Sequence, residues 1–134
     1  MQAQAILESA LYAEDLDAAE AFYTAVFALP LIRKQPGQCT FLRCGAGVLL
    51  LFNPKASITP DPANPIPRHG SIGPGHLCFA ATTADIPLWH AHFRALNIPI
   101  EADHIWPTGA RSLYVRDPAG NSIEVGEPRM WGLA

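Results

Sequence analysis

Three side chains of metal-binding type occupy related positions in two similar halves of the sequence. Glu8 and His76 each lie just inside the first predicted strand of one half, and Glu124 lies in the last predicted strand of the second half. A neutral imidazole and two carboxylates are a competent ligand set for a divalent transition metal, with positions left open for water or substrate. The sequence therefore predicts a site at Glu8, His76 and Glu124 for Fe, Mn, Ni, Co or Zn. A glutamate that leaves the metal, Glu8 above all, would serve as general base.

Further polar residues are expected on the same face. Ser112 and Tyr114 alternate with apolar neighbours, so they share a strand face with Glu124. Tyr114 is the candidate acid, although a half-buried strand aromatic explains it equally well. Arg111 is placed at the rim, where it would bind a carboxylate or phosphate; a solvated loop arginine is the alternative.

The pocket is predicted to be completed from two other segments. His104 and Trp106 lie on one face of the preceding strand candidate and would line the pocket. His69 lies in a proline-rich connection that would close over it. The predicted catalytic residues are Glu8 and Tyr114, and the predicted substrate-binding residues are Arg111, Ser112, Tyr114, His104, Trp106 and His69.

The elements that must position these residues form a duplicated pattern. Two runs rich in β-branched and aromatic residues flank Asp117–Asn121, which is typical of a β-hairpin turn. Phe41–Phe52 aligns with Tyr114–Val125 without a gap and matches Leu51 with Glu124. The fourth symmetric position of the site would then be a leucine, which cannot bind metal.

Each half is predicted to be a βαβββ unit. A strand at Ile6–Tyr12 is followed by an amphipathic helix from Leu16 to about Ala28, with Asp15 as its N-cap. The second half starts with a strand at 76–81 and a helix with the apolar stripe Ile86, Trp89, Phe93 and Leu96. The fold class is α+β: two βαβββ modules related by a pseudo-twofold, about 5–53 and 76–126, form a curved mixed sheet around a shared cleft. Residues 1–134 make one domain with a proline-rich linker at 54–75.

Composition narrows the function classes. A net charge of −3 provides no basic surface for nucleic acid. The chain contains no apolar run of membrane-spanning length and no signal peptide, so we expect a cytoplasmic protein without a membrane partner. Its three cysteines lack zinc-finger spacing and are expected to be small buried residues rather than a disulfide framework.

The paired units, the Gly75-His76 opening of the second half and the run from Arg116 to Glu124 resemble the vicinal oxygen chelate superfamily. This group includes glyoxalase I, extradiol dioxygenases, and fosfomycin and bleomycin resistance proteins. The loop Pro107–Ser112 is similar to that of the glyoxalase-domain-containing 5 group, and the Ser112, Tyr114 and Glu124 spacing resembles fosfomycin resistance proteins. Three-ligand members usually have histidine where this chain has Glu8, which argues against an ordinary glyoxalase I or an extradiol iron site.

The resemblance implies a metal-dependent enzyme for a small substrate chelated through adjacent oxygens. Its reaction would be of the glyoxalase or dioxygenase kind: a lyase, isomerase or oxygenase. The alternative is a metal-free protein that sequesters a drug or metabolite, as bleomycin resistance relatives do. Members of this superfamily often dimerise, so the resemblance also implies a homodimer, with or without exchange of modules.

Overall fold

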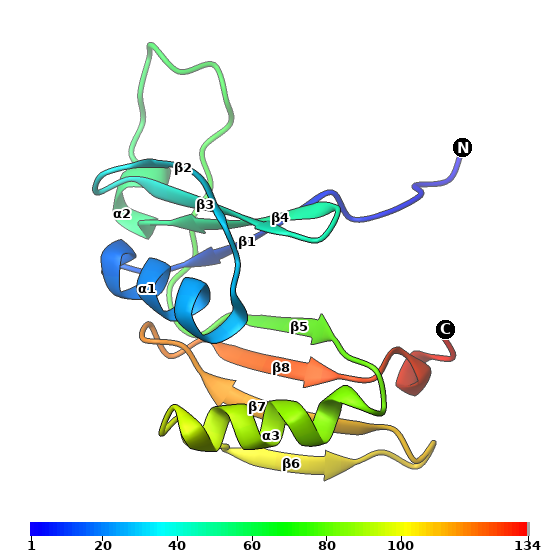
Figure 1. Ribbon diagram of the computed structural model, residues 1–134. Coiled ribbons are helices and arrows are strands. Elements are labelled where there is room, and N and C mark those ends of the chain that lie inside the picture. Colours follow the sequence, from blue (N-terminus) through cyan, green and yellow to red (C-terminus); the bar gives the residue numbers. More distant parts are fainter. Residues whose placement is uncertain (134) are drawn as a thin grey trace. The chain divides into compact units, whose positions relative to one another are not determined.

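The strands of the protein fall into two four-stranded mixed sheets, each with its own helix (Figure 1). The computed structural model describes residues 1–133. The elements are β1 Glu8–Tyr12, α1 Leu16–Phe27, β2 Leu31–Gln35, β3 Cys39–Cys44, β4 Gly47–Phe52, α2 Pro54–Ile58, β5 His76–Ala80, α3 Asp85–Ala95, β6 Ala102–Ile105, β7 Arg111–Arg116, β8 Ser122–Gly126 and the 3-10 turn η1 Pro128–Trp131. No helix among the described residues is long and apolar enough to cross a bilayer.

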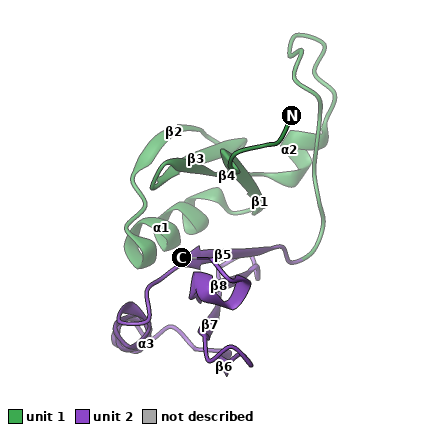
Figure 2. Ribbon diagram, turned by 90° about the vertical axis from the view of Figure 1, so that its right-hand side faces the viewer, with its two compact units in different colours: residues 1–73 green, residues 74–134 purple. Residues whose placement is uncertain are grey.

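The first unit, Met1–Gly73, is a βαβββ arrangement with one extra short helix (Figure 2). Its strand order is β1-β4-β3-β2, with β1 parallel to β4 and the other pairs antiparallel. Asp15 caps α1 by accepting a 2.9 Å hydrogen bond from the Ala18 N–H. The helix ends at Phe27, and its C-cap residue Ala28 takes a left-handed conformation. Tyr23 is fully buried and anchors the helix to the core of this unit.

The second unit begins at Pro74 and has the same topology, with the strand order β5-β8-β7-β6. Thr82 and Asp85 stabilise the turn that leads into α3, because the Asp85 N–H donates to Thr82 Oγ1 while Asp85 Oδ2 accepts from Thr82. Ile86 and Phe93 are buried in this unit. The predicted α+β class with two βαβββ modules is confirmed. The predicted stripe was wrong at Leu96, which is 43% exposed beyond the end of the helix.

The turn of the second hairpin is held by its own polar side chains. Asp117 Oδ1 accepts from the backbone N–H groups of Ala119 and Asn121, at 3.0 and 2.8 Å. Asn121 donates from Nδ2 to Asp117 Oδ2 at 2.8 Å, and its Oδ1 accepts from the N–H of Gly75 at 2.7 Å. Gly120 takes a φ of 85°, which only glycine adopts without strain. The turn is thereby tied to the residue that precedes β5.

The predicted gapless match of the two hairpins was wrong by one residue. Arg43 pairs with Val48 across the first hairpin, so residues 44–47 connect them, whereas Arg116 pairs with Ser122 and residues 117–121 connect them. The second turn is therefore one residue longer.

Because of this extra residue, the structural counterpart of Glu124 is Leu50 and not Leu51. Leu50 pairs with Ala10 as Glu124 pairs with Cys78. Leu51 lies on the opposite strand face and is fully buried. The conclusion that this position has no metal-binding side chain is unchanged, because both candidates are leucine.

The proline-rich connection contains one element that the sequence did not predict, α2. Asn53 caps it by accepting from the N–H groups of Lys55 and Ala56 at 3.0 and 3.2 Å, and Pro54 occupies its first turn, where a missing N–H costs nothing. Ser57 donates a 2.6 Å hydrogen bond to the carbonyl of His69. The helix therefore holds the later part of the connection within the first unit.

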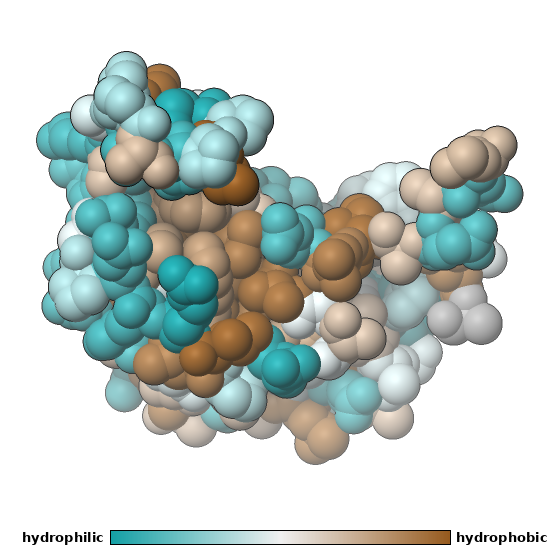
Figure 3. All heavy atoms as spheres, turned by 90° about the horizontal axis from the view of Figure 1, so that it is seen from above, coloured by the Kyte–Doolittle hydropathy of each residue, from teal (hydrophilic) through white to brown (hydrophobic). Residues whose placement is uncertain are grey.

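Surface composition is mixed on the face seen in Figure 3, where hydrophobic residues reach the surface among hydrophilic ones. Large exposed hydrophobic side chains include Ile6, Ile72, Ile105 and Trp131. All three cysteines are free; Cys39 is buried as expected, Cys44 is half-buried, and Cys78 is exposed, which corrects its predicted burial.

Candidate metal centre

One face of the second sheet gathers most of the predicted site residues. The register places Cys78, Glu124 and Tyr114 side by side across three strands. Ser112 lies in the neighbouring row, opposite Gly126 and beside His104. Paired residues on adjacent strands share a face, so Glu124, Tyr114 and Ser112 are directed to the same side of the sheet.

The face of the second sheet opposite Glu124 is apolar and buried. Leu113, Val115, Ile123 and Val125 alternate with the site residues along β7 and β8, and all four are fully buried. This face supplies the apolar core beside α3. The alternation therefore leaves the polar side chains on the face away from α3.

His76 and Glu124 form the central pair of this face. His76 Nδ1 lies 3.0 Å from the backbone carbonyl oxygen of Ser122. Because a carbonyl oxygen only accepts, Nδ1 carries the proton and donates it. In a neutral imidazole the other nitrogen, Nε2, is then an acceptor, and it lies 3.3 Å from Glu124 Oε2. Two acceptors at this distance need a cation between or beside them, either a proton or a metal ion.

Glu124 has a second unsatisfied oxygen. Its side chain is only 6% exposed, and Oε1 is buried without a hydrogen-bond partner. A buried carboxylate oxygen without a donor is costly unless a cation compensates it. The chemistry of this pair, one imidazole nitrogen and one carboxylate, fits a divalent metal ion.

The neighbouring polar groups are oriented by one another. Trp106 Nε1 donates a 2.9 Å hydrogen bond to Ser112 Oγ, and the His104 ring packs edge-on against Trp106 with centroids 4.7 Å apart. The Tyr114 ring stacks beside His76 at an interplanar angle of 25°, with centroids 6.4 Å apart. Burial raises the pKa of Tyr114 to about 12, and the Glu124 carboxylate adds to the shift. Tyr114 therefore stays protonated at neutral pH and is a hydrogen-bond donor.

Arg111 is directed away from this group. It alternates with Ser112, so it lies on the other strand face, where it forms a two-pronged ion pair with Asp103 at 2.6 and 2.5 Å. His90 of α3 lies 3.9 Å from the same carboxylate. The structure thus gives Arg111 a contact beside α3 and does not bring it to the face of Glu124.

Two predicted site residues belong to the first unit. Glu8 is exposed at the start of β1, and the alternation of this strand places it on the same face as Ala10 and Tyr12. His69 Nδ1 lies 2.7 Å from the Tyr12 hydroxyl, and its ring packs edge-on against Phe52 with centroids 4.6 Å apart. His69 therefore joins an aromatic cluster on that face of the first sheet.

The structure brings together only part of the predicted ligand set. Across residues 1–133, no three His, Cys, Asp or Glu side chains lie close enough to hold a metal ion. His76 and Glu124 are the pair that meets, and Glu8 lies in the other compact unit. The three-ligand site stays a prediction.

Sequence reasoning missed Gly126 and Met130, which border the pair, and Glu127, which directly follows β8. Atoms of Glu124, Ser112 and Met130 crowd around Gly126, which has no side chain to keep them apart. Glu127 directly follows β8, is buried, and binds Arg129. The β8 alternation would have placed Gly126 on the site face. Met130 follows the last strand, and no periodicity predicts where it lies.

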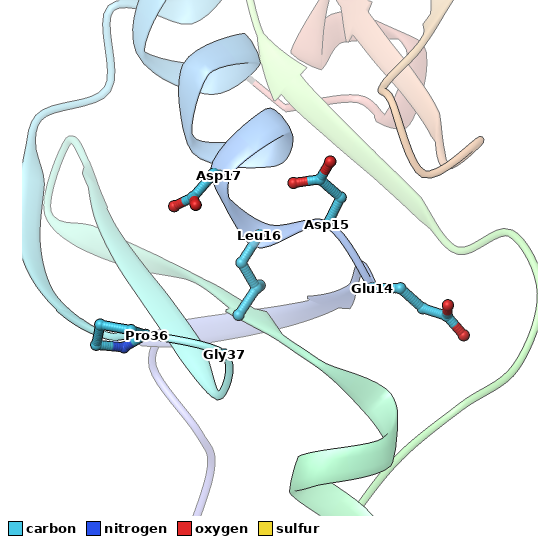
Figure 4. A pocket seen from close by; sticks show the side chains of 6 residues that line it. All are labelled: Glu14, Asp15, Leu16, Asp17, Pro36 and Gly37. Atoms are coloured by element: carbon cyan, nitrogen blue, oxygen red, sulfur yellow. The ribbon is translucent and has the colours of Figure 1, made fainter.

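A separate hollow of about 440 Å³ lies between the start of α1 and the β2–β3 turn (Figure 4). It is lined by Glu14, Asp15, Leu16, Asp17, Pro36 and Gly37, none of which was predicted as a site residue. Its acidic groups have structural partners: Asp15 caps α1, Lys55 pairs with Glu14, and Lys34 pairs with Asp17. The hollow belongs to the first unit, and its acidic groups are committed to contacts within that unit.

Comparison with known proteins identifies relatives over nearly the whole chain. Residues 5–125 match the model of the Glyoxalase/Bleomycin resistance protein/Dioxygenase superfamily. The structure is similar to that of a lactoylglutathione lyase from Agrobacterium tumefaciens, with 54% identity, a TM-score of 0.97, and coverage of 99% of this chain and 100% of that chain. No curated protein sequence gave a match.

Two more distant structures have related folds. A virulence protein from Salmonella typhimurium is 25% identical, with a TM-score of 0.71 over 95% of this chain and 98% of that chain. A fosfomycin resistance protein from Listeria monocytogenes is 15% identical, with a TM-score of 0.68 over 94% of each chain. At this low identity the second likeness shows the fold alone.

Proposed function

Because the chain belongs to the glyoxalase/bleomycin resistance protein/dioxygenase superfamily, we propose that it is a metal-dependent enzyme acting on a small oxygenated substrate. The observation that carries this proposal is the contact between His76 Nε2 and Glu124 Oε2 at 3.3 Å, while Nδ1 is committed to the Ser122 carbonyl. Two acceptors at this distance, beside an unpartnered Oε1, form a site that a bound cation would stabilise.

Glu8 is proposed as the third ligand. Glu8 occupies the place in β1 that His76 occupies in β5. Glu8 pairs with Val48, and His76 pairs with Ser122. Val48 and Ser122 are equivalent positions, because the second hairpin turn is one residue longer than the first. Its carboxylate would come from the first unit of the same chain or of a second copy. An exposed glutamate is also free to leave the metal and accept a proton from the substrate.

A divalent metal bound there would act as a Lewis acid on the substrate oxygens. The chain's own groups would then orient the substrate. Tyr114, protonated at neutral pH, would donate a hydrogen bond to an oxygen that gains negative charge. Ser112 accepts from Trp106 Nε1, and its own hydrogen, which is directed at the weak acceptor Met130 Sδ, would turn to a second substrate oxygen. His104 would support the Trp106 ring from its edge.

The named relative favours a lyase of the glyoxalase kind. The Agrobacterium tumefaciens protein that is 54% identical bears the name lactoylglutathione lyase. Two residues distinguish this chain from an ordinary glyoxalase. Glu8 stands where histidine is usual, and Leu50, which cannot bind metal, stands at the position in the first unit that corresponds to Glu124. We therefore propose a reaction related to that of a glyoxalase, on a substrate that carries two adjacent oxygens.

The first test is the metal content of the purified, untagged protein. We expect close to one equivalent of a divalent transition metal per chain by elemental mass spectrometry, lost on dialysis against a chelator and restored by Mn, Fe, Ni, Co or Zn. The reloaded protein should then be incubated with glutathione and methylglyoxal, the two fragments of lactoylglutathione, while formation of the thioester is followed by its absorbance. Retention of no metal under any condition, with tight binding of small molecules but no turnover, would favour sequestration instead.

We also predict a homodimer in solution. Light scattering coupled to size exclusion should give about twice the chain mass of 14.5 kDa. If Glu8 reaches His76 and Glu124 from a second copy, an equimolar mixture of refolded Glu8→Gln and Glu124→Gln chains should regain part of the metal-binding capacity. A particle of monomer mass would contradict the dimer and require Glu8 to act within its own chain.

A further inference from the structure

The turn η1 after the last strand reaches the face of Glu124. A Cβ atom added to Gly126 would lie 2.9 Å from Glu124 Oε1, 3.0 Å from Ser112 Oγ and 3.1 Å from Met130 Cε. These three atoms therefore converge on one point above the Gly126 backbone. The absence of a side chain at Gly126 permits this approach, and Met130 comes from outside the sheet to join it.

Met130 is the apolar member of this group. Its methyl group packs where Glu124 Oε1 is buried without a hydrogen-bond donor. Its sulfur lies 3.6 Å from Ser112 Oγ, which donates to it. A methionine side chain has no polar hydrogen to donate to the carboxylate. Met130 therefore excludes water from Glu124 Oε1 but does not supply the hydrogen bond that the water would have made.

A polar latch holds the turn in place. Arg129 Nε donates to Glu127 Oε1 at 2.9 Å, and its Nη2 donates to the carbonyl of Gly109 at 2.6 Å. Glu127 Oε2 also accepts a 2.6 Å hydrogen bond from the Arg111 N–H. The residue that precedes Met130 is thus tied both to the end of β8 and to the loop before β7.

We propose that the turn η1 is a latched shield in which Met130 keeps water from Glu124 Oε1 and so reserves that oxygen for a cation or a substrate group. Met130 is a positioning residue that acts through Glu124. The inference rests on the proposed function for what the reserved oxygen binds. The shield itself is a property of the second unit and can be tested without any metal.

If Met130 shields Glu124 Oε1 from water, substitutions at Met130 should change the affinity for a cation according to how much apolar cover they leave. Met130→Ala lets water hydrate Oε1, so a cation has to displace that water, and affinity for Mn²⁺ should fall by about 10-fold, as it does when outer-sphere partners are lost. Met130→Leu keeps the apolar cover and should bind Mn²⁺ as the wild type does. Trp131→Ala is the matched control, because it removes a larger side chain, 74% exposed, from the same turn. Calorimetric titration of the full chain with Mn²⁺ measures all four proteins.

A second measurement needs no metal at the site. The chain contains two methionines, Met1 and Met130, so ¹³C-methyl methionine labelling yields two methyl signals, one of which disappears in Met130→Leu. A soluble gadolinium chelate should broaden the signal of Met1, which is fully exposed, and spare that of Met130. Arg129→Gln, which breaks the latch, should expose Met130 to the chelate, while Arg94→Gln on α3 should leave it protected.

The outcomes separate the two proposals. Equal broadening of both methyl signals in the wild-type protein, or unchanged Mn²⁺ affinity in Met130→Ala, would overturn the shield. A protected Met130 methyl in a wild-type protein that binds none of Mn, Fe, Ni, Co or Zn would support the shield and contradict the proposed metal enzyme. Weaker binding in Met130→Ala, with full affinity in Met130→Leu and Trp131→Ala, would support both.

Discussion

Replacing Glu124 with glutamine is expected to abolish metal binding while the fold is retained. The carboxylate supplies both the charge and the oxygen that faces His76 Nε2 at 3.3 Å. An amide is neutral, and its N–H can donate to Nε2, which removes the need for a cation at that point. The affinity for Mn²⁺ should therefore fall by more than the roughly 10- to 100-fold that loss of an outer-sphere partner costs.

The same substitution should leave the metal-free protein as stable as the wild type or more so. Glu124 Oε1 is buried without a donor and Oε2 faces His76 Nε2, so the carboxylate carries a burial cost that its interactions with Tyr114 and Cys78 offset only in part and that the amide relieves. Thermal unfolding in chelator measures this. Glu101→Gln is the control, since Glu101 is half exposed and pairs with Arg116 in the same unit. Unchanged metal content in Glu124→Gln would remove Glu124 from the site.

Glu127→Gln is expected to lower the free energy of unfolding by about 2 kcal/mol near neutral pH, because buried donors lose their charged acceptor. Glu127 is 2% exposed and accepts from Thr83 Oγ1, the Arg111 N–H and Arg129. A glutamine oxygen cannot satisfy all of these, and its NH₂ group would face donors. Urea unfolding of both proteins measures the difference.

The stability difference between the wild-type and Glu127→Gln proteins should decrease as the pH falls. Hydrogen bonds from Arg129 and Thr83 lower the pKa of Glu127 to about 2, from an ordinary value of 4.5. The unfolded chain therefore takes up the proton first as the pH falls. The stabilisation by Glu127 is complete above 4.5 and is lost progressively toward pH 2. The wild-type and Glu127→Gln proteins should thus converge in stability near the lower limit, and a gap that stays constant with pH would contradict this account.

The fold could be predicted from the sequence because its signals are local. The apolar spacing from Leu16 onward and the Asp15 cap specify α1, and alternation specifies the strands. Asp117–Asn121 specifies the second hairpin turn through side-chain bonds within five residues. Such features need no knowledge of the rest of the chain.

The strand face of the candidate site residues could be predicted only where alternation decides it. Alternation correctly placed Ser112, Tyr114 and Glu124 on one face, because the β7–β8 register is regular. It also implies that Arg111 lies on the other face, a consequence that the prediction of a rim arginine overlooked. Met130 escaped prediction because its place depends on Gly126 and on the latch of Glu127, which are contacts between segments without a periodic pattern.

The extra residue in the second hairpin turn also decides which substitutions each half tolerates. In the first half, a mutation to glutamate at Leu50 would enter a half-buried position on the face that holds Glu8 and Ala10. The same mutation one residue later, at Leu51, would force a charge into a fully buried position and unfold the unit. The length of a hairpin turn therefore decides which of two neighbouring positions could accept a fourth carboxylate ligand.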